Sequence, residues 1–178
     1  KKTAALEAKY AEMSRRLTAG ISTDLSGGAR FDLDEFRSLL GDTTYLEFVA
    51  IDGRITAFVI STSNFKVFPD YADLADVESE ITQFMFQIKT GRFIGKLSEA
   101  NRETASNRLK RHSQVLFDLL IRPLGGAVDG ARLTVSPTGA MIYLPFQALH
   151  DGRQYLIERT EISYSPGASV LQSCLKRS

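Results

Sequence analysis

The stretch TYLEFVAIDGRITAFVIST, residues 44–62, decides the fold of this chain. Its two halves, 44–51 and 55–62, are rich in β-branched and aromatic residues, which favour strands. Between them lies the Asp-Gly-Arg sequence of residues 52–54, and Asp-Gly is a strong signal for a tight hairpin turn. The sequence therefore predicts an antiparallel pair of strands, with a further short extended piece over residues 65–68.

Four segments show the spacing of amphipathic helices, with apolar side chains three or four positions apart on one face. Asp32 and Glu35 resemble a capping box before the second segment, and Asp70 is the expected N-cap of the third. Arg122-Pro123 closes the fourth, because the residue before a proline disfavours the helical conformation. The apolar positions are Leu6, Tyr10, Met13 and Leu17; Leu33, Phe36, Leu39 and Leu40; Leu74, Val77, Ile81, Phe84, Met85 and Ile88; and Leu109, His112, Leu116, Leu119 and Leu120.

The last third of the chain changes to short apolar runs separated by turns. Pro145 is expected to end the ladder pairing of the second run, and residues 168–175 are a predicted helix. Together with the hairpin, these runs predict an α/β fold, a mixed sheet with an N-terminal antiparallel hairpin and packed helices. The four predicted strands are residues 133–135, 141–144, 155–158 and 161–164, of which the last two would adjoin.

Composition is that of an ordinary soluble globular protein. The 178 residues are 43% hydrophobic and 24% charged, and the formal net charge of +1 gives no indication of a nucleic-acid or membrane partner. No apolar run approaches the roughly 20 residues of a membrane span. The single cysteine, Cys174, rules out a disulfide within the chain and fits a reducing compartment, so a cytoplasmic location is expected.

Few residues could carry acid–base or nucleophilic chemistry. His112 falls on the apolar stripe of a predicted helix, which favours a structural role at the edge of the core. His150 precedes Asp151-Gly152 and is expected in a turn. Cys174 is expected to be a buried structural cysteine, because no base lies near it in the sequence. A Cys174–His150 dyad is therefore rejected, and no catalytic residue is assigned.

No metal or cofactor site is expected either. The two histidines lie 38 positions apart and the cysteine is remote, so metal-ligand spacing is missing. Gly125-Gly126 lacks the further glycines and the lysine of a phosphate-binding loop. A basic cluster on the fourth predicted helix is interrupted by acidic residues, which favours a solvated face over a nucleic-acid site. The cluster consists of Arg102, Arg108, Lys110 and Arg111.

Five short segments, in one order, resemble signatures of the CHAT family of caspase-like cysteine peptidases. LPFQAL is a close match to the family's Leu-Pro-Phe-x-Ala-Leu, and the hairpin of residues 44–62 resembles the start of such a domain. Thr138 stands where the family usually has Asp, and Gly167 where it often has Ser, which affects local turn geometry. The five segments are LFDLLIRPL (116–124), LTVSPTGAM (133–141), LPFQAL (144–149), DG with YLIE (151–158) and ISYSPGASVL (162–171).

The resemblance implies a caspase-like fold in which a histidine and a cysteine, each following a strand, perform the chemistry. In the family both lie downstream of the segment that matches 162–171, so both would fall beyond Ser178. No catalytic, cofactor-binding or metal-binding residue can therefore be carried onto this chain. Residues 32–178 would be the N-terminal part of a CHAT domain, and residues 1–31 the end of an upstream helical region. The chain begins at Lys1 and not at a methionine, so we expect it to be a piece of a longer protein.

Three functions follow as hypotheses. The first is a non-catalytic segment that supports the protease half of a cysteine endopeptidase, with that C-terminal half as its partner; an exposed apolar face would support it. The second is a non-enzymatic scaffold that contacts regulatory protein partners through the hairpin edge or the first helix. The third, and weakest, is nucleic-acid binding through residues 102–111, which would depend on salt.

Overall fold

A computed structural model of the chain describes residues 31–91 and 99–177. The chain divides into two compact units, Lys1–Asp32 and Leu33–Ser178, and every element described below belongs to the second. The helix predicted at residues 6–17 lies outside the described residues. In the part of the chain that the structure describes, no helix combines the length and apolarity needed to cross a membrane.

The predicted hairpin is confirmed. β1 (Thr43–Ile51) and β2 (Arg54–Ile60) pair antiparallel, with Tyr45 opposite Ile60 and Ile51 opposite Arg54. Asp52 and Gly53 have φ angles of 50° and 76°, so both central turn residues occupy the left-handed region. This is the requirement of a type I′ turn, whose twist matches the right-handed twist of the two strands.

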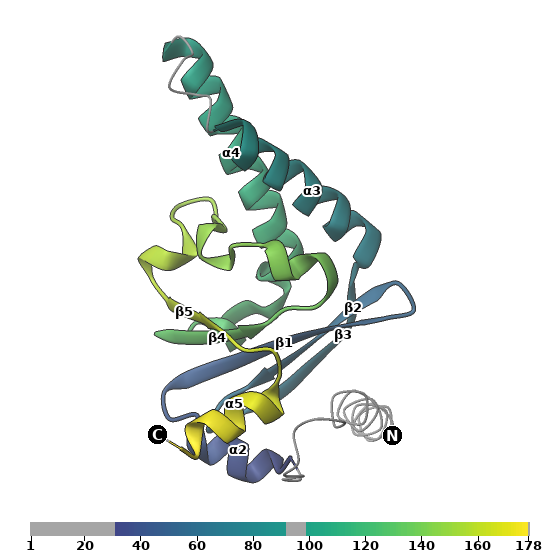
Figure 1. The fold of residues 1–178 in the computed structure, drawn as a ribbon, viewed down its shortest axis with the longest axis vertical. Helices are drawn as coiled ribbons and strands as arrows, with labels where there is room; N and C mark the ends of the chain where they lie inside the picture. Colours follow the sequence, from purple (N-terminus) through teal and green to yellow (C-terminus); the bar gives the residue numbers. More distant parts are fainter. Residues whose placement is uncertain (1–30, 92–98, 178) are drawn as a thin grey trace. The chain divides into compact units, whose positions relative to one another are not determined.

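Strands on both sides of this hairpin complete the sheet. β3 (Phe65–Asp73) pairs antiparallel with β2, while β4 (Arg132–Ser136) pairs parallel with β1, and β5 (Glu161–Tyr164) pairs parallel with β4. The strand order is β3-β2-β1-β4-β5 (Figure 1). The structure thus confirms the α/β class and the mixed sheet, and it confirms the strands predicted at 133–135 and 161–164.

Two long helices cover one face of the sheet. α3 (Leu74–Gly91) and α4 (Glu99–Leu120) pack against each other, and the 3-10 helix η2 (Arg122–Val128) follows directly. Figure 1 shows both helices rising from the same side of the strands. Their apolar stripes enter one core cluster with the strands, as the spacing predicts. That cluster includes Val77, Ile81 and Phe84 of α3, Leu116, Phe117 and Leu120 of α4, and Leu46, Phe48, Leu133 and Val135 of the sheet.

Two short helices lie together on the opposite face. α2 (Leu33–Leu39) presents Phe36 edge-on to Tyr45 of β1, with ring centroids 5.2 Å apart. α5 (Ala168–Leu175) packs on α2, where the Glu35 carboxylate accepts a hydrogen bond from Gln172 at 3.1 Å and pairs with Lys176 at 2.7 Å. The first and last helices of the unit are therefore in direct contact (Figure 1).

The N-cap predicted for α3 is wrong. Asp70 lies inside β3 with a φ of 51°, because pairing with β2 carries the strand past Pro69. The residue that caps α3 is Asp73, whose Oδ1 accepts hydrogen bonds from the N–H groups of Ala75 at 2.9 Å and Asp76 at 3.4 Å. An aspartate in this position satisfies N–H groups that the first helical turn leaves without partners.

The strand predicted at residues 141–144 is also wrong. Residues 141–143 belong to the 3-10 helix η3 (Gly139–Tyr143), Leu144 is its C-cap, and the 3-10 helix η4 (Phe146–Ala148) follows. Met141 and Leu144 are buried while the two residues between them are exposed, a spacing that fits three residues per turn. Pro145 therefore ends no strand ladder; it stands at the N-cap of η4.

The run at residues 155–158 forms a further 3-10 helix, η5 (Leu156–Glu158), with Tyr155 at its N-cap, rather than the predicted strand. Leu156 is buried in the core, whereas Ile157 is exposed, so this run adds no strand beside β5. The LPFQAL segment enters the core, since Leu144, Phe146 and Leu149 all belong to the core cluster.

Candidate functional site

The edge of the sheet at β5 is open. The N–H groups of Glu161 and Ser165 donate to the carbonyls of Ala131 and Val135 in the direction of β4, at 2.8 and 3.0 Å. Backbone groups alternate in direction along a strand, so those of Ile162 and Tyr164 point away from β4. No strand among residues 31–91 and 99–177 pairs with this side of β5. The outward side therefore offers N–H and C=O groups to a further strand.

The other edge, β3, is protected against such pairing. Pro69 interrupts its row of N–H donors, and the register with β2 shifts between Ile55 and Ala57. At the irregular position, the N–H of Asp70 donates to the side-chain hydroxyl of Thr56 at 3.2 Å. Proline and bulges are devices by which proteins block unwanted strand addition at an edge. β5 contains neither a proline nor a bulge, so its edge lacks the protection that the β3 edge has.

Exposed apolar side chains gather in the segment that leads into β5. Tyr143 is 74% exposed, Ile157 64% and Ile142 62%, although each stands next to a core residue in sequence. Of the eight large hydrophobic side chains that are exposed among the described residues, five lie within residues 142–164. Single exposed apolar side chains are ordinary, but a concentration of them indicates a contact surface.

Tyr164 ties β5 to η4. Its hydroxyl accepts a hydrogen bond from the N–H of Phe146 at 2.9 Å and donates one to Gln147 Oε1 at 2.7 Å. Its ring meets that of Phe146 edge-on, with centroids 6.3 Å apart. Burial raises the pKa of the Tyr164 hydroxyl above its usual range, and the hydrogen bond from Phe146 partly offsets that rise. These contacts fix the last strand against the buried part of the LPFQAL segment.

Amide hydrogen exchange tests the open edge. In the 178-residue chain, we expect the amide hydrogens of Ile162 and Tyr164 to exchange at rates near those of an unstructured peptide. The amides of Glu161 and Ser165, which donate to β4, should exchange at least about 100-fold more slowly, equivalent to a local opening free energy of about 3 kcal/mol. Equal protection at all four positions would mean that another segment or a second copy already pairs with β5.

His150 is more than the turn residue that the sequence predicts. It is buried, its Nδ1 accepts a hydrogen bond from the N–H of Gly152 at 2.9 Å, and its ring meets Tyr155 edge-on at 4.8 Å. The adjacent Asp151 accepts hydrogen bonds from the backbone N–H groups of Gln154 and Arg153, which lower the pKa of its carboxyl. This arrangement holds the loop between η4 and η5, which is a structural role.

His112 and Cys174 do not combine with His150. The Nδ1 atom of His112 lies 2.6 Å from Glu80, so the half-buried histidine joins α4 to α3, as expected for a residue at the core edge. Cys174 is exposed on α5, and the prediction that it is buried is wrong. α5 and the loop of His150 lie on opposite faces of the sheet (Figure 1), which separates the two members of the rejected dyad.

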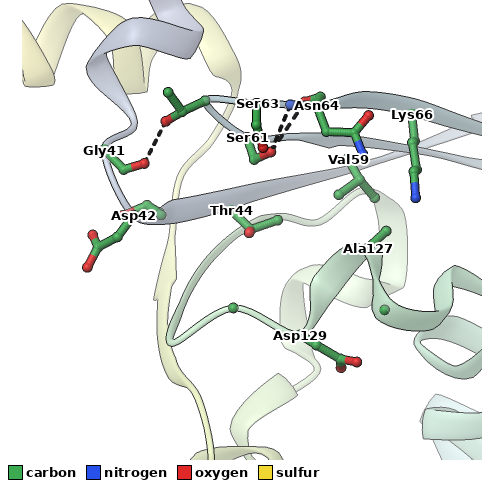
Figure 2. Close-up of a pocket in the computed structure, with 14 residues that line it drawn as sticks. Gly41, Asp42, Thr44, Val59, Ser61, Ser63, Asn64, Lys66, Ala127 and Asp129 are labelled. Carbon is green, nitrogen blue, oxygen red and sulfur yellow. Dashed lines mark hydrogen bonds between the residues drawn. The ribbon is translucent and has the colours of Figure 1, made fainter.

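A polar pocket of about 380 Å³ opens at the amino ends of β1 and β4 (Figure 2). Its lining includes Thr44, Ser61, Ser63 and Lys66. Each of its two aspartates forms an ion pair with an arginine outside the pocket. Asp42 pairs with Arg132 at 3.2 Å, and Asp129 with Arg159 at 2.9 Å.

This pocket does not have the composition or the position of a hydrolytic site. Its lining residues include no histidine and no cysteine, so its hydroxyl groups have no imidazole base within the pocket. Sites in open α/β sheets lie at the carboxyl ends of the strands, which is the other end of β1 and β4. The pocket was not predicted from the sequence, because loops that are distant in the chain form its walls. The signal that could have pointed to it is the run Ser61-Thr62-Ser63-Asn64, whose composition indicates a turn.

The remaining sequence-based predictions concern the basic cluster and metals. Arg102, Arg108, Lys110 and Arg111 are all exposed on α4, as a solvated face requires. Within residues 31–91 and 99–177, no group of three or more histidine, cysteine or carboxylate side chains is placed to hold a metal ion.

Comparison with known families identifies the part of the chain that carries the open edge. Residues 110–178 match the family model described as the CHAT domain. Over these residues the chain resembles a CHAT domain, and we call residues 110–178 the CHAT segment. No curated protein matches the chain. The predicted resemblance is confirmed for this segment, whereas its extension to residue 32, which includes the β1–β2 hairpin, remains a prediction.

The CHAT segment contains every feature of the open edge. It runs from the second half of α4 through β4 and the four 3-10 helices to β5 and α5. Its Leu-Pro-Phe-x-Ala-Leu motif supplies Phe146, which is fully buried and stacks on Phe48 with ring centroids 5.6 Å apart. The motif thus anchors the CHAT segment to β1, a strand outside the matched residues. β1 and β4 also pair parallel, so the two parts share one sheet and one core.

Proposed function

We propose that residues 33–178 form a non-catalytic part of a CHAT-family cysteine endopeptidase, and that the sheet continues from β5 into the protease half. The observation that carries the proposal is the open edge of β5. Among the described strands β5 pairs only with β4, so the N–H and C=O groups on its outward side form a template for a further strand. The backbone groups of Ile162 and Tyr164 are positioned to hydrogen-bond a next strand.

The exposed side chains around this edge support the same proposal. A strand beside β5 and a helix packed over it would cover apolar surface at Tyr164 of β5, and Tyr143 and Ile157 in the preceding segment are likewise left in contact with water by the described residues. Removing such surface from water contributes roughly 25 cal/mol per Å². Protection of the β3 edge further favours growth of the sheet in one direction only, from β5.

The role of this part would be mechanical. The protease half would supply the thiolate nucleophile and the histidine base, while β4 and β5 hold the sheet from which that half extends. The chain alone is then inactive, because its histidines and its cysteine have structural positions or lie on opposite faces of the sheet. Peptidase turnover that disappears in Cys174→Ala would contradict this assignment.

The decisive experiment is to read the coding sequence downstream of Ser178. We expect it to encode a strand followed by a His-Gly pair and then another strand followed by a cysteine, and we expect exchange of either residue for alanine to abolish turnover of the longer protein. A reading frame that continues without this pair would refute the peptidase proposal. The open edge would then serve a regulatory scaffold that binds another protein.

A further inference from the structure

The far ends of α3 and α4 form a projection that reaches past the sheet. We define the hairpin tip as residues 85–91 of α3 and 99–111 of α4. The buried residues of α3 end at Phe84 and those of α4 begin at Ser113, so every side chain described in the tip is at least partly exposed. At 1.5 Å per residue, Glu99 lies about 21 Å along the helix axis from Ser113. Figure 1 shows this projection clearly.

The net charge of the tip is opposite in sign to that of residues 33–84. It carries five cations and two carboxylates, a net of +3, while residues 33–84 carry three cations and ten carboxylates, a net of −7. The charges are therefore segregated, although the whole chain has a net charge of only +1. The tip thus presents a positive field of its own, bounded towards the sheet by Glu80, which contacts His112 next to Arg111. Its charged residues are Lys89, Arg102, Arg108, Lys110, Arg111, Glu99 and Glu103.

A groove of about 360 Å³ runs between the two helices of the tip. On α4 it is lined by residues 101, 104, 105 and 108, whose spacing of three, one and three places them on one face of the helix. On α3 it is lined by Phe86, which is 58% exposed, with Gln87 and Thr90. Small side chains at Thr104 and Ala105 thus lie opposite an aromatic ring, a surface suited to a third helix.

We propose that the hairpin tip docks an acidic amphipathic helix of a partner protein. An apolar side chain of that helix would pack on Phe86 and into the space over Ala105. Its carboxylates would face Arg108 and Arg111, which are three residues apart and so share one side of α4. The result is a three-helix arrangement that covers apolar surface which two helices alone leave exposed.

The surface favours an acidic helix over a nucleic acid. Glu99 and Glu103 flank Arg102 and would repel a continuous row of phosphates. The groove holds one aromatic ring, whereas single-stranded nucleic acids bind to successive stacking side chains. A long polyanion would also meet the strongly acidic residues 33–84, whereas a short helix could bind at the tip alone.

A binding assay with defined probes tests the proposal on the 178-residue chain. The probe is a fluorescently labelled synthetic helix with leucine at heptad positions a and d and glutamate at the others; its counterpart has lysine in place of glutamate. We expect fluorescence anisotropy to show binding of the glutamate helix that weakens as salt is raised. Arg108→Glu combined with Arg111→Glu, and separately Phe86→Ser, should each weaken it by about tenfold or more.

Two control variants keep the test specific. Val115→Ser removes an exposed apolar side chain of α4 outside the tip, and Arg153→Glu reverses an exposed charge in the CHAT segment. Neither should change affinity, and circular dichroism should show that all variants remain folded, since each site is exposed. Failure of the glutamate helix to bind, equal binding of the lysine helix, or tighter binding of oligothymidine would overturn the proposal. None of these results depends on whether a protease half follows β5.

Discussion

Phe146→Ala should remove a large part of this protein's stability. The side chain has no exposed surface, stacks on Phe48 and meets Tyr164 edge-on. Truncation of a buried phenylalanine lowers the free energy of unfolding by about 3–5 kcal/mol, through lost burial and the cavity that remains. A domain of this size commonly has only about 5–15 kcal/mol in total. Urea unfolding followed by circular dichroism measures the change.

The expected loss is specific to position, and a neighbour provides the control. Ile142 lies four residues earlier in the same CHAT segment but is 62% exposed, so Ile142→Ala should change stability by less than about 0.5 kcal/mol. Phe146→Leu keeps most of the volume and should recover part of the loss. If Phe146→Ala were as stable as Ile142→Ala, the Leu-Pro-Phe-x-Ala-Leu motif would not be the anchor between the CHAT segment and β1.

Local chemistry made much of the fold predictable. The Asp-Gly turn has both φ angles in the left-handed region, and this requirement is visible in the sequence because few other residue pairs tolerate it. The stripes of α3 and α4 were predictable for a similar reason, since long amphipathic periods are hard to mistake. The strand predicted at 161–164 is confirmed as β5.

Short apolar runs were predicted less well, because strand and helix periods cannot be distinguished over four residues. Residues 141–144 have the composition of a strand, but Met141 and Leu144 are buried three positions apart in a 3-10 helix. The error at Asp70 has another cause. Pairing of β3 with β2 is a tertiary contact that overrides the local capping signal, and only Asp73 is then free to cap α3.

Cys174 shows a signal that could have been used. The inward face of α5 consists of Ala168, Leu171, Gln172 and Leu175, at spacings of three, one and three, and Cys174 lies off that face. A buried glutamine on this face was not predictable, because its partner Glu35 is 137 positions away in sequence. The polar pocket and the contact of His112 with Glu80 depend on the same kind of distant approach.

At high pH, Tyr71 should make the protein lose stability. Its ring packs against the core, its hydroxyl donates to the carbonyl of Leu120 at 3.3 Å, and burial raises the pKa of that hydroxyl well above its ordinary value near 10. The neutral form is therefore favoured in the folded state. Its contribution is fully present below pH 10 and is lost as pH rises from there toward the folded pKa, by up to about 1.4 kcal/mol per pH unit.

The comparison of two tyrosine variants isolates this contribution from other groups that titrate in alkali. Tyr71→Phe should lower stability at neutral pH by about 1 kcal/mol, because the Leu120 carbonyl loses its donor, yet it should flatten the decline between pH 10 and 12. Tyr143→Phe, at a side chain that is 74% exposed, should leave both values unchanged. Urea midpoints measured across this range decide the matter. If the stability of Tyr71→Phe fell as steeply with rising pH as that of the unmodified chain, deprotonation of Tyr71 would not cause the loss of stability in alkali. The packing of β3 against the end of α4 would then not depend on the protonation of this hydroxyl.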